Sequence, residues 1–148
     1  MMVKQAEELT LRLERLVRAD RARVFAAWTE PEELAKWSAP KGLTIPEGDV
    51  DLRVGGRWRV VMVEPDGRRH EAFGRYLEVT PPERLVYTHQ WVDGDGSTPE
   101  TTLTLEFHEA PGGTRMVLTQ VGFADAGGRD GHEYGWSSAL DNLVALFE

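Results

Sequence analysis

Hydrophobic and polar residues alternate through the middle of the chain, from Val50 to Trp91. The positions on one side of this alternation are large and often aromatic: Trp58, Val60, Met62, Leu85, Tyr87, His89 and Trp91. A period of two residues is typical of β-strands, and the turns that separate the runs favour an antiparallel meander. A strand face that mixes Trp, Met, Tyr and His is more typical of a ligand-cavity wall than of a plain core.

The same alternation recurs outside this region and predicts seven strands in all. They are expected at Glu8–Val17, Asp49–Val54, Arg57–Glu64, Glu71–Val79, Arg84–Val92, Thr101–Glu109 and Thr114–Gly122. Polar or glycine-rich turns separate the later runs, at residues 93–96 and 111–113. We therefore expect the strands to pair mainly with their neighbours in the chain.

Two short helices are predicted between the first and second strands. Asp20 is suited to cap the first, which runs through Trp28. Thr29 is suited to cap the second, with Pro31 near its first position and Glu32 completing a capping box.

The end of the chain carries the pattern of a long helix. The triplet at residues 126–128, Ala-Gly-Gly, interrupts the strand pattern, and Asp130 and Glu133 have capping-box spacing. Apolar residues then recur at helical spacing: Trp136, Leu140, Leu143, Val144 and Phe147. A lone amphipathic helix buries its apolar stripe against the concave face of a curved sheet. The order predicts an α+β fold, a curved antiparallel sheet of about seven strands wrapped on a long C-terminal helix.

Length and charge narrow the classes of function. A chain of 148 residues predicts one domain, residues 1–148. The net charge of −8 disfavours nucleic acid as a partner. No apolar run is long enough to span a bilayer, and the N-terminus has no apolar leader pattern. With no cysteine, the sequence excludes disulfides and fits a reducing, cytoplasmic location. A monomer or a homodimer is compatible with these features.

We expect neither a metal nor a cofactor. The four histidines lack metal-ligand spacing, and no serine lies in a nucleophile motif. The candidate ligand-binding residues are the inward-facing aromatic and polar positions with their apolar neighbours: Trp58, Met62, Tyr76, Tyr87, His89, Trp91, Gln120, Trp136 and Leu140.

Some of these candidates have alternative interpretations. His89 is either a buried neutral histidine bonded to a neighbour, a ligand contact or a general base. Gln120 bonds either a ligand or a neighbouring side chain. For the tryptophans the alternative is core packing, which is the most frequent role of a large aromatic side chain.

Several segments together resemble the START-like or SRPBCC superfamily, which has the helix-grip fold. They are Val24–Pro31 with Leu34 and Trp37, Val54–Trp58, Gly74–Val79, Pro81–Tyr87, and Gly135–Trp136 with Leu140–Leu143. The branch that the chain most resembles is the heat-shock protein 90 ATPase activator homologue family.

This resemblance implies three candidate functions. The leading hypothesis is a binder of a small hydrophobic or amphipathic molecule, held between the sheet and the last helix. The alternatives are a chaperone-linked interaction module and a cyclase- or hydrolase-type enzyme that uses His89.

Overall fold

The computed structural model describes residues 9–148, in which three helices accompany one eight-stranded sheet. The helices are α2 (Arg21–Thr29), α3 (Pro31–Trp37) and α4 (Ala126–Leu146). The strands are β1 (Leu11–Val17), β2 (Thr44–Val50), β3 (Arg57–Val63), β4 (Arg69–Thr80), β5 (Arg84–Asp93), β6 (Gly96–Ser97), β7 (Thr101–Ala110) and β8 (Gly113–Val121). The predicted start of the first strand, at Glu8, lies outside the described residues.

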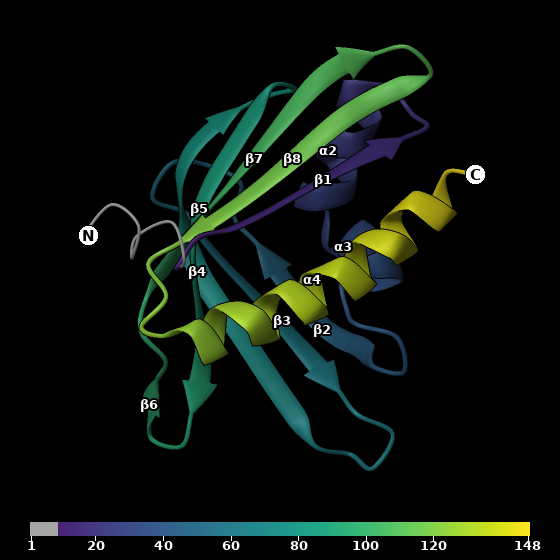
Figure 1. Ribbon diagram of the computed structural model, residues 1–148. Coiled ribbons are helices and arrows are strands. Elements are labelled where there is room, and N and C mark those ends of the chain that lie inside the picture. Colours follow the sequence, from purple (N-terminus) through teal and green to yellow (C-terminus); the bar gives the residue numbers. More distant parts are fainter. Residues whose placement is uncertain (1–8) are drawn as a thin grey trace.

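The sheet is antiparallel throughout, in the order β1-β8-β7-β5-β4-β3-β2, with the short β6 paired to β5. Figure 1 shows α4 lying across one face of this curved sheet, with α2 and α3 beside the C-terminal part of α4. The predicted α+β helix-grip architecture is confirmed.

The core lies between the sheet and α4. Along β7, buried and half-buried residues alternate from Thr101 to Phe107, as the period of two requires. On α4, Leu140 and Leu143 are fully buried, and Val144 and Phe147 pack against the same core while partly exposed. The predicted apolar stripe of the last helix is therefore the stripe that faces the sheet.

Strand β2 lies earlier in the chain than predicted. The sequence indicated Asp49–Val54, whereas the strand covers Thr44–Val50 and pairs with β3. Pro46 sits where the register with β3 shifts, on an edge strand, which is where a sheet tolerates proline. The residues that follow turn back instead, because the Asp51 amide bonds the Arg57 carbonyl.

Two helix starts also differ from the prediction. The cap of α4 is Asp125, whose carboxylate accepts the Gly128 amide at 2.8 Å. The glycines predicted to break the pattern are instead in its first turn. In α3 the N-cap is Glu30 and makes no side-chain cap bond, while the Thr29 hydroxyl bonds the Phe25 carbonyl. The Asp20 cap of α2 is confirmed by its bond to the Arg23 amide.

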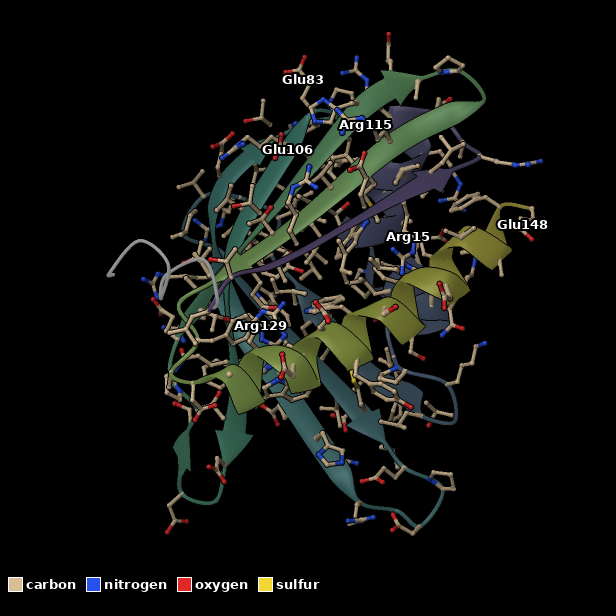
Figure 2. All side chains as sticks on the ribbon, viewed as in Figure 1. Arg15, Glu83, Glu106, Arg115, Arg129 and Glu148 are labelled. Carbon is tan, nitrogen blue, oxygen red and sulfur yellow. The ribbon has the colours of Figure 1, made fainter. Side chains whose placement is uncertain are left out.

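Two arginines, both labelled in Figure 2, connect α4 to the segment of β1. Arg15 of β1 donates to the Ser137 hydroxyl at 3.1 Å and lies 3.7 Å from the Asp141 carboxylate. Arg129 of α4 donates to the Thr10 carbonyl at 2.9 Å. Arg129 thus holds the N-terminal end of α4, beside the cavity described next, and Arg15 holds its C-terminal half.

Candidate functional site

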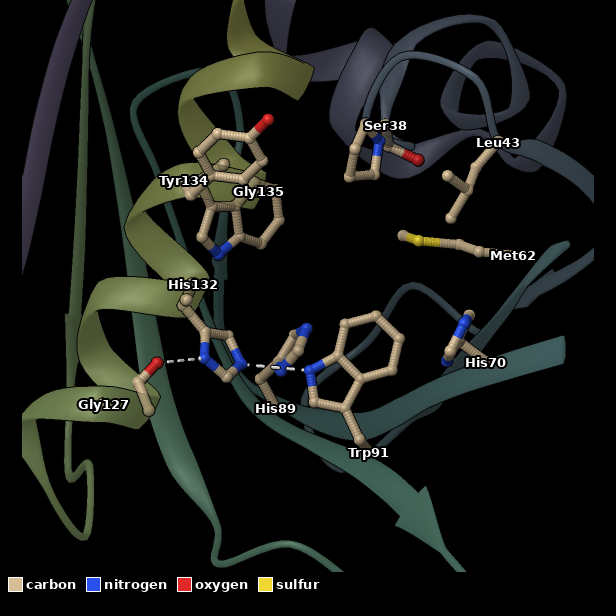
Figure 3. Close-up of a pocket in the computed structure, with 14 residues that line it drawn as sticks. Ser38, Leu43, Met62, His70, His89, Trp91, Gly127, His132, Tyr134 and Gly135 are labelled. Atoms are coloured by element: carbon tan, nitrogen blue, oxygen red, sulfur yellow. Dashed lines mark hydrogen bonds between the residues drawn. The ribbon is translucent and has the colours of Figure 1, made fainter. Parts of the chain in front are cut away.

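A cavity of about 460 Å³ lies between the N-terminal half of α4, the middle strands and the loop after α3. Its wall comprises Ser38, Pro40, Leu43, Met62, His70, His89, Trp91, Gly127, Gly128, Gly131, His132, Tyr134, Gly135 and Trp136. Figure 3 shows these side chains surrounding an open space. The volume is within the range of roughly 300–1,000 Å³ that is usual for small-molecule sites.

Glycines on α4 leave part of the helix side of the wall without side chains. Gly127, Gly131 and Gly135 recur every four residues, so they share one face of α4. A Cβ atom built at Gly131 would meet nothing within 4 Å. Each glycine in a helix interior costs about 0.5–1 kcal/mol relative to alanine. The sequence thus leaves open a space that ordinary helix-forming residues would fill.

His89, on β5, lies at the bottom of this cavity and is 5% exposed. Its ring is surrounded by the rings of Trp58 and Trp91, each 5.4 Å away between centroids, and of Trp136 at 6.1 Å. Burial, and secondarily the neighbouring His132, lower the pKa of His89 from 6.5 to about 3. Its imidazole is therefore neutral near pH 7, and Nδ1 has no hydrogen-bond partner among residues 9–148.

His132, on α4, differs because both of its ring nitrogens are used. Nε2 lies 3.0 Å from the Trp91 indole nitrogen, which donates to it. Nδ1 lies 2.7 Å from the Gly128 carbonyl oxygen, which can only accept. These two partners assign the proton of a neutral ring to Nδ1. His132 therefore links α4 to β5 and offers no free nitrogen to a ligand.

Gln120 is also fully engaged, in a buried network behind the cavity wall. Its amide oxygen accepts from the Trp136 indole at 2.9 Å, and its amide nitrogen donates to the Thr101 hydroxyl at 2.9 Å. The Thr101 hydroxyl in turn donates to the His89 carbonyl. Of the two interpretations of Gln120, the structure favours bonding to neighbouring side chains, which fixes α4, β8, β7 and β5 relative to one another.

A smaller cavity of about 40 Å³ lies deeper, towards the sheet. Its wall includes Trp58, Tyr76 and Tyr87, and it shares Ser38, Met62, His89 and Trp136 with the larger cavity. Burial raises the pKa of both tyrosines, so their hydroxyls are protonated near neutral pH. His89 therefore lies at the boundary between an outer apolar space and an inner space with phenolic groups.

The structure brings together most of the candidate ligand-binding residues. Met62, His89, Trp91 and Trp136 line the outer cavity, and Trp58, Tyr76 and Tyr87 line the inner one. Gln120 and Leu140 belong to neither wall, and Leu140 is fully buried in the core.

Sequence reasoning missed the part of the wall that α4, the loop after α3 and the start of β4 provide. The missed residues are Ser38, Pro40, Leu43, His70, Gly127, Gly128, Gly131, His132, Tyr134 and Gly135. The glycine spacing of four residues was the available signal, because three glycines on one helical face leave a groove. The groove was not predicted because residues 126–128 were interpreted as a break in the pattern.

Neither cavity wall contains an aspartate, glutamate, lysine or arginine. No group of three or more possible metal ligands occurs within residues 9–148. Over the same residues, no helix has the length and hydrophobicity needed to cross a bilayer. The site is thus built for hydrophobic contact with a few neutral polar groups, and it holds no carboxylate that would activate His89.

Comparisons with known proteins agree with this architecture. A protein of Chromobacterium violaceum is 33% identical, with 95% of this chain and 97% of that chain aligned and a TM-score of 0.86. The AHSA1 protein of Silicibacter pomeroyi is 32% identical, with coverages of 93% and 96% and a TM-score of 0.84. An AHSA1-like protein of Aeromonas hydrophila is 27% identical, with coverages of 92% and 90% and a TM-score of 0.74.

The family comparison covers most of the chain. Curated proteins yielded no match. The model of the family described as "Activator of Hsp90 ATPase homolog 1-like protein" matches residues 18–148, which include every wall residue of both cavities. The chain therefore belongs to the activator of Hsp90 ATPase homolog 1-like family.

Proposed function

We propose that this protein is a cytoplasmic binder of a small hydrophobic or amphipathic molecule, held between α4 and the sheet. The observation that carries the proposal is the cavity of about 460 Å³ beneath the glycine face of α4. Apolar contact with Trp91, Trp136 and Met62 supplies the main driving force, since burial yields about 25 cal/mol per Å² of apolar surface. The absence of cysteine fits the proposed compartment.

Binding is a better interpretation than catalysis. A general base works best with a pKa near the working pH, and burial lowers the pKa of His89 to about 3. Within residues 9–148, the unpartnered Nδ1 shows that no carboxylate orients the ring through that atom. A desolvated neutral imidazole instead serves as a hydrogen-bonding group in a ligand site.

The test is a substitution on α4 that fills the cavity with a side chain. Gly131→Leu places a side chain in space where a Cβ atom meets nothing, so the variant should fold. It should weaken binding of an uncharged naphthylamine fluorophore by about tenfold or more, because the ligand and the leucine compete for one volume. Fluorescence titration measures this, and native mass spectrometry of the purified protein should reveal any co-purified compound.

Gly131→Ala is the matched control. It adds one methyl group, should leave most of the cavity open, and should retain binding close to that of the wild type. If a folded Gly131→Leu protein bound the fluorophore as well as the wild type did, this cavity would not be the binding site.

Family membership favours a second candidate, a chaperone-linked interaction module. This candidate predicts a direct complex with a heat-shock protein 90 homologue and an altered rate of ATP hydrolysis by that partner. Purified components and an ATPase assay distinguish it from ligand binding, because Gly131→Leu should not affect an interaction through the outer surface.

A further inference from the structure

Several polar groups of the outer cavity wall already have hydrogen-bond partners within the protein. The Trp91 indole donates to His132, and the Trp136 indole donates to Gln120. The Ser38 hydroxyl donates to the Leu34 carbonyl. These bonds occupy the donors of Trp91, Trp136 and Ser38, and the remaining hydroxyl of the wall belongs to Tyr134, which is 81% exposed to solvent.

His89 is the exception. Within residues 9–148, its Nδ1 is the buried polar atom of the cavity wall that lacks a hydrogen-bond partner. Because leaving a buried polar group without a partner destabilises a protein, such a group is usually matched by a hydrogen-bonding partner. In Figure 3 the His89 ring projects from β5 into the cavity beside Trp91.

The charge of the wall limits what that partner is. Neither cavity is lined by an aspartate, glutamate, lysine or arginine, so an ionised group inside would be desolvated without a counter-ion from these residues. Such burial costs several kcal/mol per ion. His89 does not offset this cost, because the low pKa keeps its ring neutral near pH 7.

The N-terminus of α4 would attract an anion, and it lies at the cavity because Gly127 and Gly128 are part of the wall. The Gly128 amide is not free, however. The Asp125 carboxylate caps the helix by accepting the Gly128 amide at 2.8 Å, and it adds a negative charge there. This end of the helix is therefore occupied by the protein's own carboxylate.

We infer that the ligand carries an uncharged oxygen group, a hydroxyl or carbonyl, which hydrogen-bonds His89 while its apolar body lies against Trp91, Trp136 and the glycine face of α4. This inference rests on the proposed function and specifies its ligand class. It distinguishes alcohols, phenols, ketones and esters from carboxylates, sulfonates and phosphates of the same skeleton.

Three probes of one skeleton test the inference: ethylnaphthalene, acetylnaphthalene and naphthoate. Each competes with the naphthylamine fluorophore at about pH 8, where naphthoate is ionised. Acetylnaphthalene should bind the wild-type protein about a hundredfold more tightly than naphthoate, because only the ketone enters without leaving a charge unpaired.

Variants of His89 identify the contact. His89→Leu should weaken acetylnaphthalene by about tenfold and leave ethylnaphthalene unchanged or slightly tighter, because only the ketone loses a hydrogen bond. His89→Gln keeps a hydrogen-bonding amide and should retain most ketone binding. His108→Leu is the matched control, since His108 of β7 belongs to neither cavity wall and pairs with Glu106. It should not change the ratio of ketone to hydrocarbon affinity.

The outcomes separate the two proposals. If ethylnaphthalene binds and naphthoate binds as tightly as acetylnaphthalene or more tightly, the inference about charge is wrong, whereas the proposed apolar binding site is retained. An equal effect of His89→Leu on the ketone and the hydrocarbon overturns the assignment to His89. Failure of all three probes to bind overturns the proposed function, and the inference with it.

Discussion

Burial of His89 should make the protein less stable between pH 7 and pH 5. In the unfolded chain this imidazole titrates near 6.5, whereas burial lowers its pKa to about 3 in the folded protein. As the pH falls below 6.5, the unfolded chain takes up a proton that the folded protein does not. The stability is therefore fully present above the unfolded pKa and is lost as the pH falls towards the folded pKa.

The magnitude follows from those two values. Over the window from about pH 7 to about pH 5, linkage lowers the free energy of unfolding by about 2 kcal/mol. For a domain of this size that corresponds to roughly 4–8 °C in the melting temperature. The lower end of the window lies above the pKa values of Glu14, Glu33 and Glu47, which their basic partners lower from 4.5, so these carboxylates stay ionised throughout.

The assay is urea unfolding at several pH values for the wild type and for His89→Gln, which fills a similar volume but cannot titrate. The other histidines are present in both proteins, so their contributions cancel in the difference. The difference in unfolding free energy should change by about 2 kcal/mol across the window. Parallel pH profiles for the two proteins would refute the claim that His89 is buried and neutral.

Two further predictions concern packing. Leu143→Ala should lower stability by about 2–5 kcal/mol, because Leu143 is fully buried between α4 and the sheet. Leu146→Ala, at a 39% exposed position of the same helix, should lower the free energy of unfolding much less. Urea unfolding of both variants measures this difference. Gly74→Ala should impair folding, because its Cβ would lie 1.9 Å from the Thr88 carbonyl oxygen and 2.7 Å from the Trp58 indole nitrogen. Circular dichroism of Gly74→Ala checks this, and a native-like melt would show that the strands can move apart there.

Periodicity along the chain predicted the order of the elements, apart from the short β6, and the buried face of the strands that line the site. Alternation placed Trp58, Tyr87 and His89 inward, and the helical stripe placed Leu140 and Leu143 against the sheet. These inferences succeed because the periods of 2.0 and 3.6 residues are set by the backbone and require no long-range contact. The desolvated state of His89 follows from the same parity, since an inward histidine without a carboxylate loses its hydration.

The packing of distant elements, rather than any local pattern, sets which polar groups are free and where the cavity opens. Gln120 and His89 both face inward, yet Gln120 is bonded to Trp136 and Thr101 while His89 Nδ1 has no partner among the described residues. Their partners come from elements far apart in the sequence, so local pattern cannot distinguish them. The glycines of α4 likewise resemble a helix break in the sequence. In the structure Asp125 caps the helix that contains them, and the sheet lies opposite their face. A cavity is the volume left between packed elements, and its position depends on the distances between those elements rather than on any one of them.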